Sequence, residues 1–262
     1  PLARGAAAWL LKGMTHAPLP TARPHLKEPR FLTLRTITAL ILREMTSTYG
    51  RSPGGYVWAL VQPIGMIVIL SVGCSLFVST PSLGTSFILF YATGYLPFDM
   101  YGTIATKIKG ALSYSRALLA YPRVTWLDTV IARLLLNTLT MSMVFCILIT
   151  AILFVVDTRT VITIEPILAG LALASGVGLG VGMMNCVLGG IFPVWDILWS
   201  IISRPLFLAS GVIFIYEDLP PLAQSILWWN PLMHITGLVR TGFYPTYNAS
   251  YVTPAYVVFV ML

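Results

Sequence analysis

The chain has 262 residues, of which 57% are hydrophobic and only 10% are charged. Because roughly a quarter of the residues in soluble domains are charged, this composition excludes an ordinary soluble enzyme and leaves no room for a second globular domain. The formal net charge of +7 would suit a nucleic-acid binder, but the placement of the basic residues indicates a membrane protein instead.

The first thirty residues are rich in Pro, Ala and Arg, and we expect them to form a mobile cytoplasmic tail. Their one apolar run, Ala6–Leu11, is too short for the core of a signal peptide. The predicted organisation is therefore a tail over residues 1–30 and one transmembrane domain over residues 31–262.

Phe31–Tyr49 is predicted to be an amphipathic helix along the cytoplasmic surface of the membrane. Apolar side chains recur on one face at spacings of three and four: Phe31, Leu34, Ile37, Ile41 and Met45. The Gly- and Pro-containing run at residues 50–55 then allows a sharp turn into the membrane. A surface anchor with no further role would give the same pattern.

Five apolar stretches are long enough to cross a bilayer, since about 20 helical residues span a hydrocarbon core of about 30 Å. Within lipid every backbone amide must be bonded locally, so these stretches are predicted helices. They are Val57–Val78, Phe87–Thr106, Leu127–Val155, Ile167–Phe192 and Ile197–Ile215. A sixth is expected to begin near Pro254 and to be truncated here. The predicted fold class is all-α, a polytopic membrane protein with six transmembrane helices.

Lys and Arg residues gather in two segments. Of the 16, eight precede the first span and four lie between spans two and three. The positive-inside rule therefore places the N-terminus and this connection in the cytoplasm. The basic excess is an orientation signal and not a nucleic-acid footprint.

Two connections are more than simple loops. In Lys107–Trp126, a short helix is predicted over Ala111–Ala120, stopped by Tyr121-Pro122. It would be either a docking element for a cytoplasmic partner or a solvated basic loop that sets topology.

Between spans five and six, Leu222–Leu238 is apolar but is split at Asn230-Pro231. Trp228 and Trp229 favour the level of the lipid headgroups. We expect two short re-entrant helices in the outer leaflet, with plain extracellular packing as the alternative.

Charged residues deep in a span are costly and are candidate functional sites. Asp99 lies about 18 Å from the outer end of its span, and Arg204 lies about 14 Å from the cytoplasmic end of its own. We hypothesise that both line a hydrated passage, with a structural ion pair as the alternative. Arg133, near the start of its helix, is expected to extend toward the cytoplasmic headgroups.

An aromatic stripe follows the second span at spacings of four, three and three: Tyr91, Tyr95, Phe98 and Tyr101. Hydroxyl-bearing rings can slide along sugar faces, which suits a transported glycan, although helix packing would give the same spacing. On the fourth span, Gly176, Gly180 and neighbouring small residues permit close helix approach, within one subunit or across a dimer.

The chain lacks the motifs of an enzyme. It has no Gly-rich phosphate loop, no metal-ligand cluster and no nucleophile beside a base. We therefore predict no catalytic residues, no metal site and no cofactor of its own. Uphill transport would draw its energy from a separate ATPase.

Two motifs carry a resemblance to a known family. Tyr49-Gly50-Arg51-Ser52 followed by Gly55-Tyr56-Val57-Trp58-Ala59-Leu60-Val61-Gln62-Pro63 resembles the entry to the first span of type-2 ABC exporter permeases. Trp229-Asn230-Pro231-Leu232-Met233-His234, with Arg240 and Phe243, is similar to the branch that exports capsular polysaccharide.

This resemblance implies a homodimer bound to two copies of a separate ATP-binding subunit, which would hold the ATP and Mg. It implies a lipid-linked polysaccharide as cargo, periplasmic and outer-membrane polysaccharide export proteins as partners, and the inner membrane of a Gram-negative bacterium as location. The expected substrate pathway contains Tyr91, Tyr95, Phe98, Asp99, Tyr101 and Arg204. The residues expected to couple to the ATPase are Arg35, Arg43, Glu44, Arg51, Ser113, Arg116, Tyr121, Pro122 and Arg123. The expected outer gate contains Trp228, Trp229, Asn230, Pro231, His234 and Arg240.

Other functions stay open at this point. An O-antigen, teichoic-acid or drug exporter of the same superfamily is the nearest alternative. An integral-membrane enzyme acting on lipid-linked sugars is disfavoured by the scarcity of acid–base residues. A passive channel would not need cytoplasmic docking helices.

Overall fold

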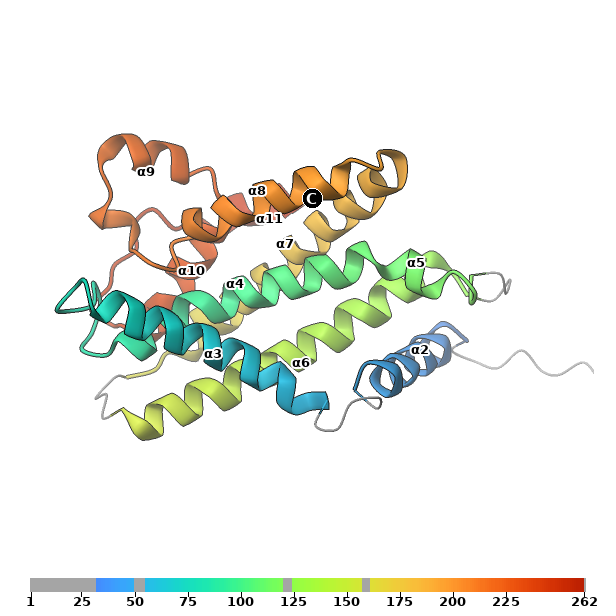
Figure 1. Cartoon of the computed structure of the whole chain (residues 1–262), viewed down its shortest axis with the longest axis horizontal. Coiled ribbons are helices and arrows are strands. Elements are labelled where there is room, and N and C mark those ends of the chain that lie inside the picture. Colours follow the sequence, from blue (N-terminus) through green and yellow to red (C-terminus); the bar gives the residue numbers. More distant parts are fainter. Residues whose placement is uncertain (1–31, 50–54, 120–123, 157–160, 262) are drawn as a thin grey trace, which may run out of the picture. The chain divides into compact units, whose positions relative to one another are not determined.

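The computed structural model describes residues 32–49, 55–119, 124–156 and 161–261, and the regular elements in these ranges are all helices (Figure 1). The all-α prediction is therefore confirmed. The chain divides into two compact units, Pro1–Arg35 and Thr36–Leu262. The contacts between helices from Thr36 onward lie within the second unit, and the predicted tail at residues 1–30 lies outside the described residues.

The elements follow one another along the chain as a series of long helices and shorter connecting helices. They are α2 (Leu32–Tyr49), α3 (Gly55–Ser75), α4 (Phe87–Lys109), α5 (Ala111–Ser115), α6 (Trp126–Val155), α7 (Ile164–Ile191), α8 (Trp195–Ala209), the 3-10 helix η1 (Tyr216–Asp218), α9 (Pro221–Leu227), α10 (Pro231–Phe243) and α11 (Pro254–Met261).

Most predicted spans agree with observed helices to within a few residues. Three helices in the described ranges, α3, α6 and α7, are long and apolar enough to cross a membrane by length and composition. Helix α4 has the length, 23 residues, but its tyrosines and charged residues make it less apolar. The count of six spans stays a prediction.

The predicted fifth span was too long. Helix α8 has 15 residues and ends at Ala209, six residues before the predicted end, so it extends only about 22 Å. The cause is Gly211, whose φ of 69° lies in the left-handed region that ends helices.

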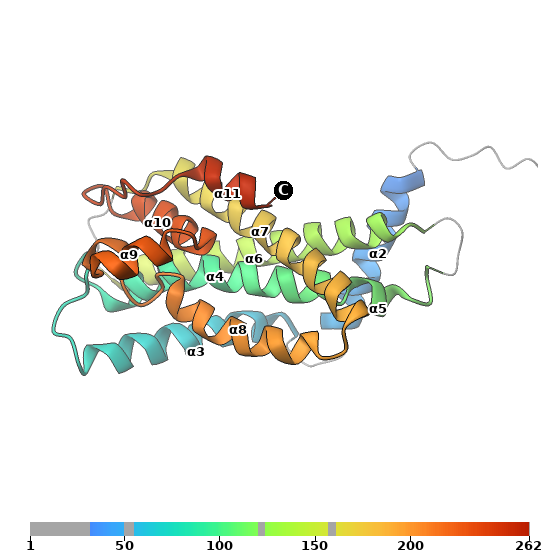
Figure 2. The same cartoon turned by 90° about the horizontal axis from the view of Figure 1, so that it is seen from above.

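Helix α4 is the centre of the second unit. It packs against α3, α6, α7 and α10, and Figure 2 shows α3 and α8 along one side of it and α7 with α11 along the other. Large side chains such as Phe90, Met100 and Ile104 are almost completely buried. Because neighbouring helices cover α4, it can carry polar residues that lipid would not accept.

Helix α7 approaches α4 closely through its glycines. Close helix approach was predicted for this span, but its partner was not. A Cβ atom at Gly182 would lie 2.7 Å from the Cβ of Ile108 and 2.9 Å from a backbone carbonyl of α4. Gly176 and Gly180 lie against Met261 of α11. The small residues therefore serve packing within the subunit.

The shorter elements agree in part with the predictions. Helix α5 ends at Ser115, and in the turns that follow the amides of Leu118 and Leu119 both bond to the Ser115 carbonyl. The predicted end at Ala120 lies outside the described residues. The apolar segment before the last helix does form two short helices, α9 and α10. The side chain of Asn230 caps α10 by accepting the Leu232 amide at 3.1 Å, which is the preferred chemistry at a helix start. Whether these two helices enter a membrane stays a prediction.

The close contact between α4 and α7 predicts different outcomes for two alanine substitutions on one helix. Gly182→Ala should destabilise the protein by about 1–3 kcal/mol, because the added methyl group overpacks a backbone contact. Gly190→Ala, where nothing lies within 4 Å, should be neutral or stabilising by up to about 1 kcal/mol, since alanine favours the helix. Thermal unfolding of the two purified variants in detergent checks this. Equal unfolding temperatures would contradict it.

Candidate functional site

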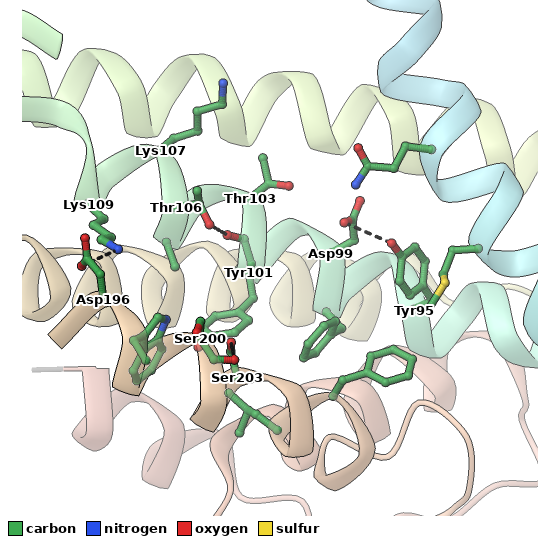
Figure 3. Close-up of a pocket in the computed structure, with 18 residues that line it drawn as sticks. Tyr95, Asp99, Tyr101, Thr103, Thr106, Lys107, Lys109, Asp196, Ser200 and Ser203 are labelled. Carbon is green, nitrogen blue, oxygen red and sulfur yellow. Dashed lines mark hydrogen bonds and ion pairs between the residues drawn. The ribbon is translucent and has the colours of Figure 1, made fainter. Parts of the chain in front are cut away.

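A cavity of about 720 Å³ lies between α3, α4 and α8 (Figure 3). One part of its lining is aromatic: Tyr95, Phe98, Tyr101, Trp199 and Phe207. Another part carries hydroxyl and amide groups: Gln62, Thr103, Thr106, Ser200 and Ser203. The cavity therefore offers ring faces and neutral hydrogen-bonding groups side by side.

Side chains, and not close backbone packing, join α4 to α8 across this cavity. The rings of Phe98 and Phe207 meet edge to face with centroids 5.3 Å apart, and the Tyr95 ring lies 6.4 Å from Phe207. Such contacts are individually weak. The space between the two helices can therefore be occupied by another molecule without breaking a tightly packed core.

Asp99 is the one acidic residue midway along the cavity wall of α4. Its Oδ1 accepts a hydrogen bond from the Tyr95 hydroxyl at 3.3 Å, and no ion pair to Asp99 occurs among the described residues. Arg204 is exposed and does not line the cavity. Its neighbour Ser203 lines the cavity, and Arg204 is turned from Ser203 by about 100° around the helix. The structure thus does not bring the two predicted charges together.

An ion pair lies at one end of the cavity, away from Asp99. Lys109 Nζ, at the last residue of α4, is 2.7 Å from Asp196 Oδ1 in the first turn of α8, as Figure 3 shows. The two side chains are 30% and 57% exposed, so the pair contributes little stability by itself. It links two helices at one mouth of the cavity and can separate at low cost.

The predicted aromatic stripe divides into two parts. Tyr95, Phe98 and Tyr101 line the cavity, whereas Tyr91 is buried in the core against Phe87 and Phe90. The α8 side of the cavity was missed by the sequence reasoning. Trp199, Ser203 and Phe207 recur there at a spacing of four, a periodic pattern that could have been read as one helix face.

A second cluster surrounds Arg133 on α6. Its side chain is only 8% exposed, and its Nε donates to Glu44 Oε2 of α2 at 3.1 Å. Its Nη1 donates to the Lys107 carbonyl at the end of α4 at 2.6 Å. The expectation that Arg133 extends to the headgroups is wrong, because a buried carboxylate from another helix satisfies its charge inside the protein.

The ring of Tyr114, the fourth residue of α5, completes this Arg133 cluster. The guanidinium of Arg133 lies 4.4 Å from the ring centroid and that of Arg43 lies 5.1 Å from it. The Tyr114 hydroxyl is hydrogen bonded to Ser47. Four helices, α2, α4, α5 and α6, are therefore joined at one point.

The predicted coupling residues are distributed unevenly around this cluster. Glu44 is occupied by the buried ion pair, while Ser113 and Arg116 are exposed at α5 and just after it. Arg35 and Arg43 lie on α2. Arg51, Tyr121, Pro122 and Arg123 lie outside the described residues.

The predicted gate residues form a third cluster at the α9–α10 junction. Trp228, Trp229 and Asn230 connect the two helices, and Pro231 is the first residue of α10. His234 Nδ1 accepts the Thr253 amide at 3.3 Å, so Nε2 carries the proton and donates to the Trp228 carbonyl at 2.8 Å. Burial lowers the pKa of His234, in keeping with this neutral form.

Arg240 of α10 is 2% exposed and is bonded without a carboxylate. Its Nη1 and Nη2 donate to the carbonyls of Phe214 and Val212 at 2.9 and 3.0 Å, and its guanidinium lies 4.3 Å from the centroid of the Phe90 ring. Arg240 thus fastens α10 to the segment after α8 and to α4. Its side chain stabilises the packing of these elements inside the protein and does not form a surface contact.

Within the described ranges, no group of three or more His, Cys, Asp or Glu side chains could hold a metal ion. The three clusters are the cavity lining, the Arg133 cluster and the cluster at the α9–α10 junction, and they offer ring faces, hydroxyls and ion pairs. These groups bind and position molecules, and nothing in this arrangement supplies a nucleophile with its base.

Comparison with known proteins gives the family. Residues 35–244 match the ABC-2 type transporter family. The chain is 30% identical over 214 residues to the polysialic acid transport protein KpsM of Escherichia coli, covering 81% of this chain and 82% of the relative. It is 31% identical over 212 residues to the capsule polysaccharide export inner-membrane protein BexB of Haemophilus influenzae, covering 80% and 79%. It is 26% identical over 223 residues to the capsule polysaccharide export inner-membrane protein CtrC of Neisseria meningitidis, covering 85% and 84%. The matched region contains α3 to α10 and all three clusters, and the chain belongs to the ABC-2 type transporter family.

Proposed function

We propose that this chain is the transmembrane subunit of an ATP-driven exporter that moves lipid-linked capsular polysaccharide across a Gram-negative inner membrane. The observation that carries this proposal is the similarity to relatives named for polysialic acid transport and capsule polysaccharide export, over about four-fifths of this chain and of each relative. The same family supports a permease and not an enzyme.

The cavity between α3, α4 and α8 is the proposed wall of the passage. Its rings present flat apolar faces to sugar rings, and its hydroxyl and amide groups exchange hydrogen bonds with sugar hydroxyls. Weak, repeated contacts of this kind suit a polymer that must move on after each contact. Asp99 and Arg204 stay predicted pathway residues, with Arg204 relying on surroundings that a second copy of the chain supplies.

The proposed assembly is a homodimer with two copies of a separate ATP-binding subunit, which hold the ATP and Mg. The N-terminus is cytoplasmic, α2 lies along the membrane surface, and α2 and α5 together contact the ATP-binding subunit. The Arg133 cluster supports this arrangement, since it holds α2 and α5 to the ends of α4 and α6. Movement of either short helix would then reach α4, which forms a cavity wall.

At the opposite end, α9 and α10 are the proposed re-entrant outer gate, facing periplasmic and outer-membrane export partners. Leu222, Ile226 and Trp229 are well exposed and recur on one face of this segment, which suits contact with outer-leaflet lipid. An O-antigen, teichoic-acid or drug exporter remains the rival within the superfamily.

Removal of rings from the cavity should impair export. The double variant Phe98→Leu/Phe207→Leu keeps apolar volume but removes two ring faces, each worth about 0.5–1.5 kcal/mol in aromatic contacts, and should reduce surface polysaccharide at least several-fold. Phe87→Leu, on the same helix α4 but outside the cavity, is the matched control and should export normally. Cell-surface and intracellular polymer are measured in a strain lacking its own permease. Normal export by the double variant would contradict the proposed passage.

The Arg133–Glu44 pair can be tested by a double-mutant cycle. Arg133→Met leaves the Glu44 carboxylate buried and unpaired, and should destabilise the protein by about 3–5 kcal/mol. Adding Glu44→Met should restore most of the stability, because both charges are then absent. For the double variant we expect the unfolding temperature to recover while export stays reduced, because the link between α2 and α6 is weakened. Full recovery of both would show that the pair serves stability alone.

Charge reversal at an exposed position tests the docking surface directly. Arg116→Glu should weaken co-purification of the ATP-binding subunit and leave membrane insertion of the permease unchanged, because Arg116 is exposed and has no structural partner to lose among the described residues. Unchanged co-purification would place the docking surface elsewhere. Absence of any ATP-binding protein in preparations of the unaltered complex would remove the proposed motor.

A further inference from the structure

An apolar groove of about 240 Å³ lies between α3 and α6. The described residues that line it are all aliphatic, among them Ile64 and Val68 on α3 and Leu148, Ile152 and Val155 on α6. A cavity of this composition does not hold ordered water, whereas it accepts an apolar ligand.

A second, hydroxyl-lined cavity of about 420 Å³ adjoins the groove. The two share Ile88 and Val156 as lining residues. The second cavity is lined by hydroxyls of Ser71 and Ser75 on the last turns of α3, and of Thr85 and Ser86 before α4. None of the described residues that line it is charged. An apolar groove thus leads into an uncharged recess in which hydroxyl groups lie among apolar side chains.

Ser71 is the distinctive group of this recess. It is 5% exposed, and its hydroxyl has no hydrogen-bond partner within the described part of the protein. By contrast, Ser75 donates to the Val72 carbonyl and Ser86 accepts the Leu89 amide. A buried hydroxyl without a partner is unfavourable, and a ligand oxygen in the recess would satisfy it.

The groove and recess are separate from the proposed passage. On α3, Gln62 and Met66 face the passage cavity, while Ile64, Val68 and Ser71 are turned roughly half a circle from them by helical register. Figure 1 shows the end of α3, the start of α4 and the end of α6 at the same end of the second unit. The site therefore lies at one end of membrane-crossing helices, on the flank away from the passage.

We propose that this combined site binds one phospholipid molecule of the bilayer, with an acyl chain in the groove between α3 and α6 and its ester region at Ser71. A neutral ester carbonyl accepts the Ser71 hydrogen, and the acyl chain packs against the aliphatic lining of the groove. A bilayer lipid, and not the tail of the cargo, is the occupant because the site is on the far side of α3 from the passage. The inference requires a membrane-embedded chain and does not depend on which polymer is exported.

The test uses the full chain in phospholipid vesicles that contain no cargo and a small fraction of phosphatidylcholine with a diazirine in one acyl chain. After irradiation, peptide mass spectrometry maps the labelled residues. We expect label on α6 around Ile152 to exceed that around Leu139, which is exposed on the same helix and outside the groove. Equal labelling of the two positions would show ordinary lipid contact and overturn the proposal.

Variants separate the two halves of the site. Ile152→Trp fills the groove and should abolish the excess label, while Leu139→Trp, the matched control, should leave it unchanged. Ser71→Ala should lower groove occupancy at limiting probe by roughly fivefold, the size expected of one hydrogen bond, and Ser71→Thr should retain it. Unfolding temperatures confirm that each variant is folded. An unchanged Ser71→Ala would overturn the assignment of the ester region, and label that appears only when cargo is present would overturn the choice of occupant.

Discussion

The close approach of α7 to α4 is the constraint on which the other features depend. Glycines on α7 let the two backbones meet, so that α4 is enclosed by protein on most sides. An enclosed helix can carry groups that lipid would reject, and α4 carries groups that take part in all three clusters. Phe90 lies under Arg240, Asp99 lines the cavity, and the Lys107 carbonyl accepts from Arg133. A shift of α4 would therefore change the contacts of both Arg240 and Arg133.

The two arginines that are buried in the described part of the chain show two ways of holding a cation away from water. Arg133 has a carboxylate partner, Glu44, and its loss would leave an unpaired charge. Arg240 has backbone carbonyls and a ring face, which solvate the guanidinium without fixing a second charge. In the proposed transporter, the first joins elements near the ATP-binding subunit and the second fastens the outer gate to α4.

By contrast, the contacts across the cavity are weak ones. Ring edges and a half-exposed ion pair connect α4 to α8, and each costs little to separate. The molecule thus combines rigid junctions at its ends with a loosely bridged space between α3, α4 and α8. In the proposed mechanism, this difference lets motion of the helix ends widen the passage without unfolding the unit.

The sequence by itself determined the properties that depend on one segment at a time. Length and apolarity identified α3, α6 and α7, the Asn230-Pro231 break separated α9 from α10, and the small residues of α7 indicated close packing. The motifs around the first span and before the last helix identified the family. Each of these signals reports a local preference, for lipid, for a turn or for close approach.

Only the tertiary structure decided which side chains meet. Arg133 and Glu44 are 89 residues apart, and nothing in either local pattern selects the other as partner. The stripe on α4 was visible, but its division into the buried Tyr91 and the cavity-lining Tyr95 depends on where α8 lies. Counting residues placed Arg204 along its helix but could not show that it is exposed and does not line the cavity, because the direction in which a side chain faces depends on helix rotation. Which side chains meet depends on the angles at which helices distant in sequence pack, and the sequence of one segment does not specify the position of its neighbour.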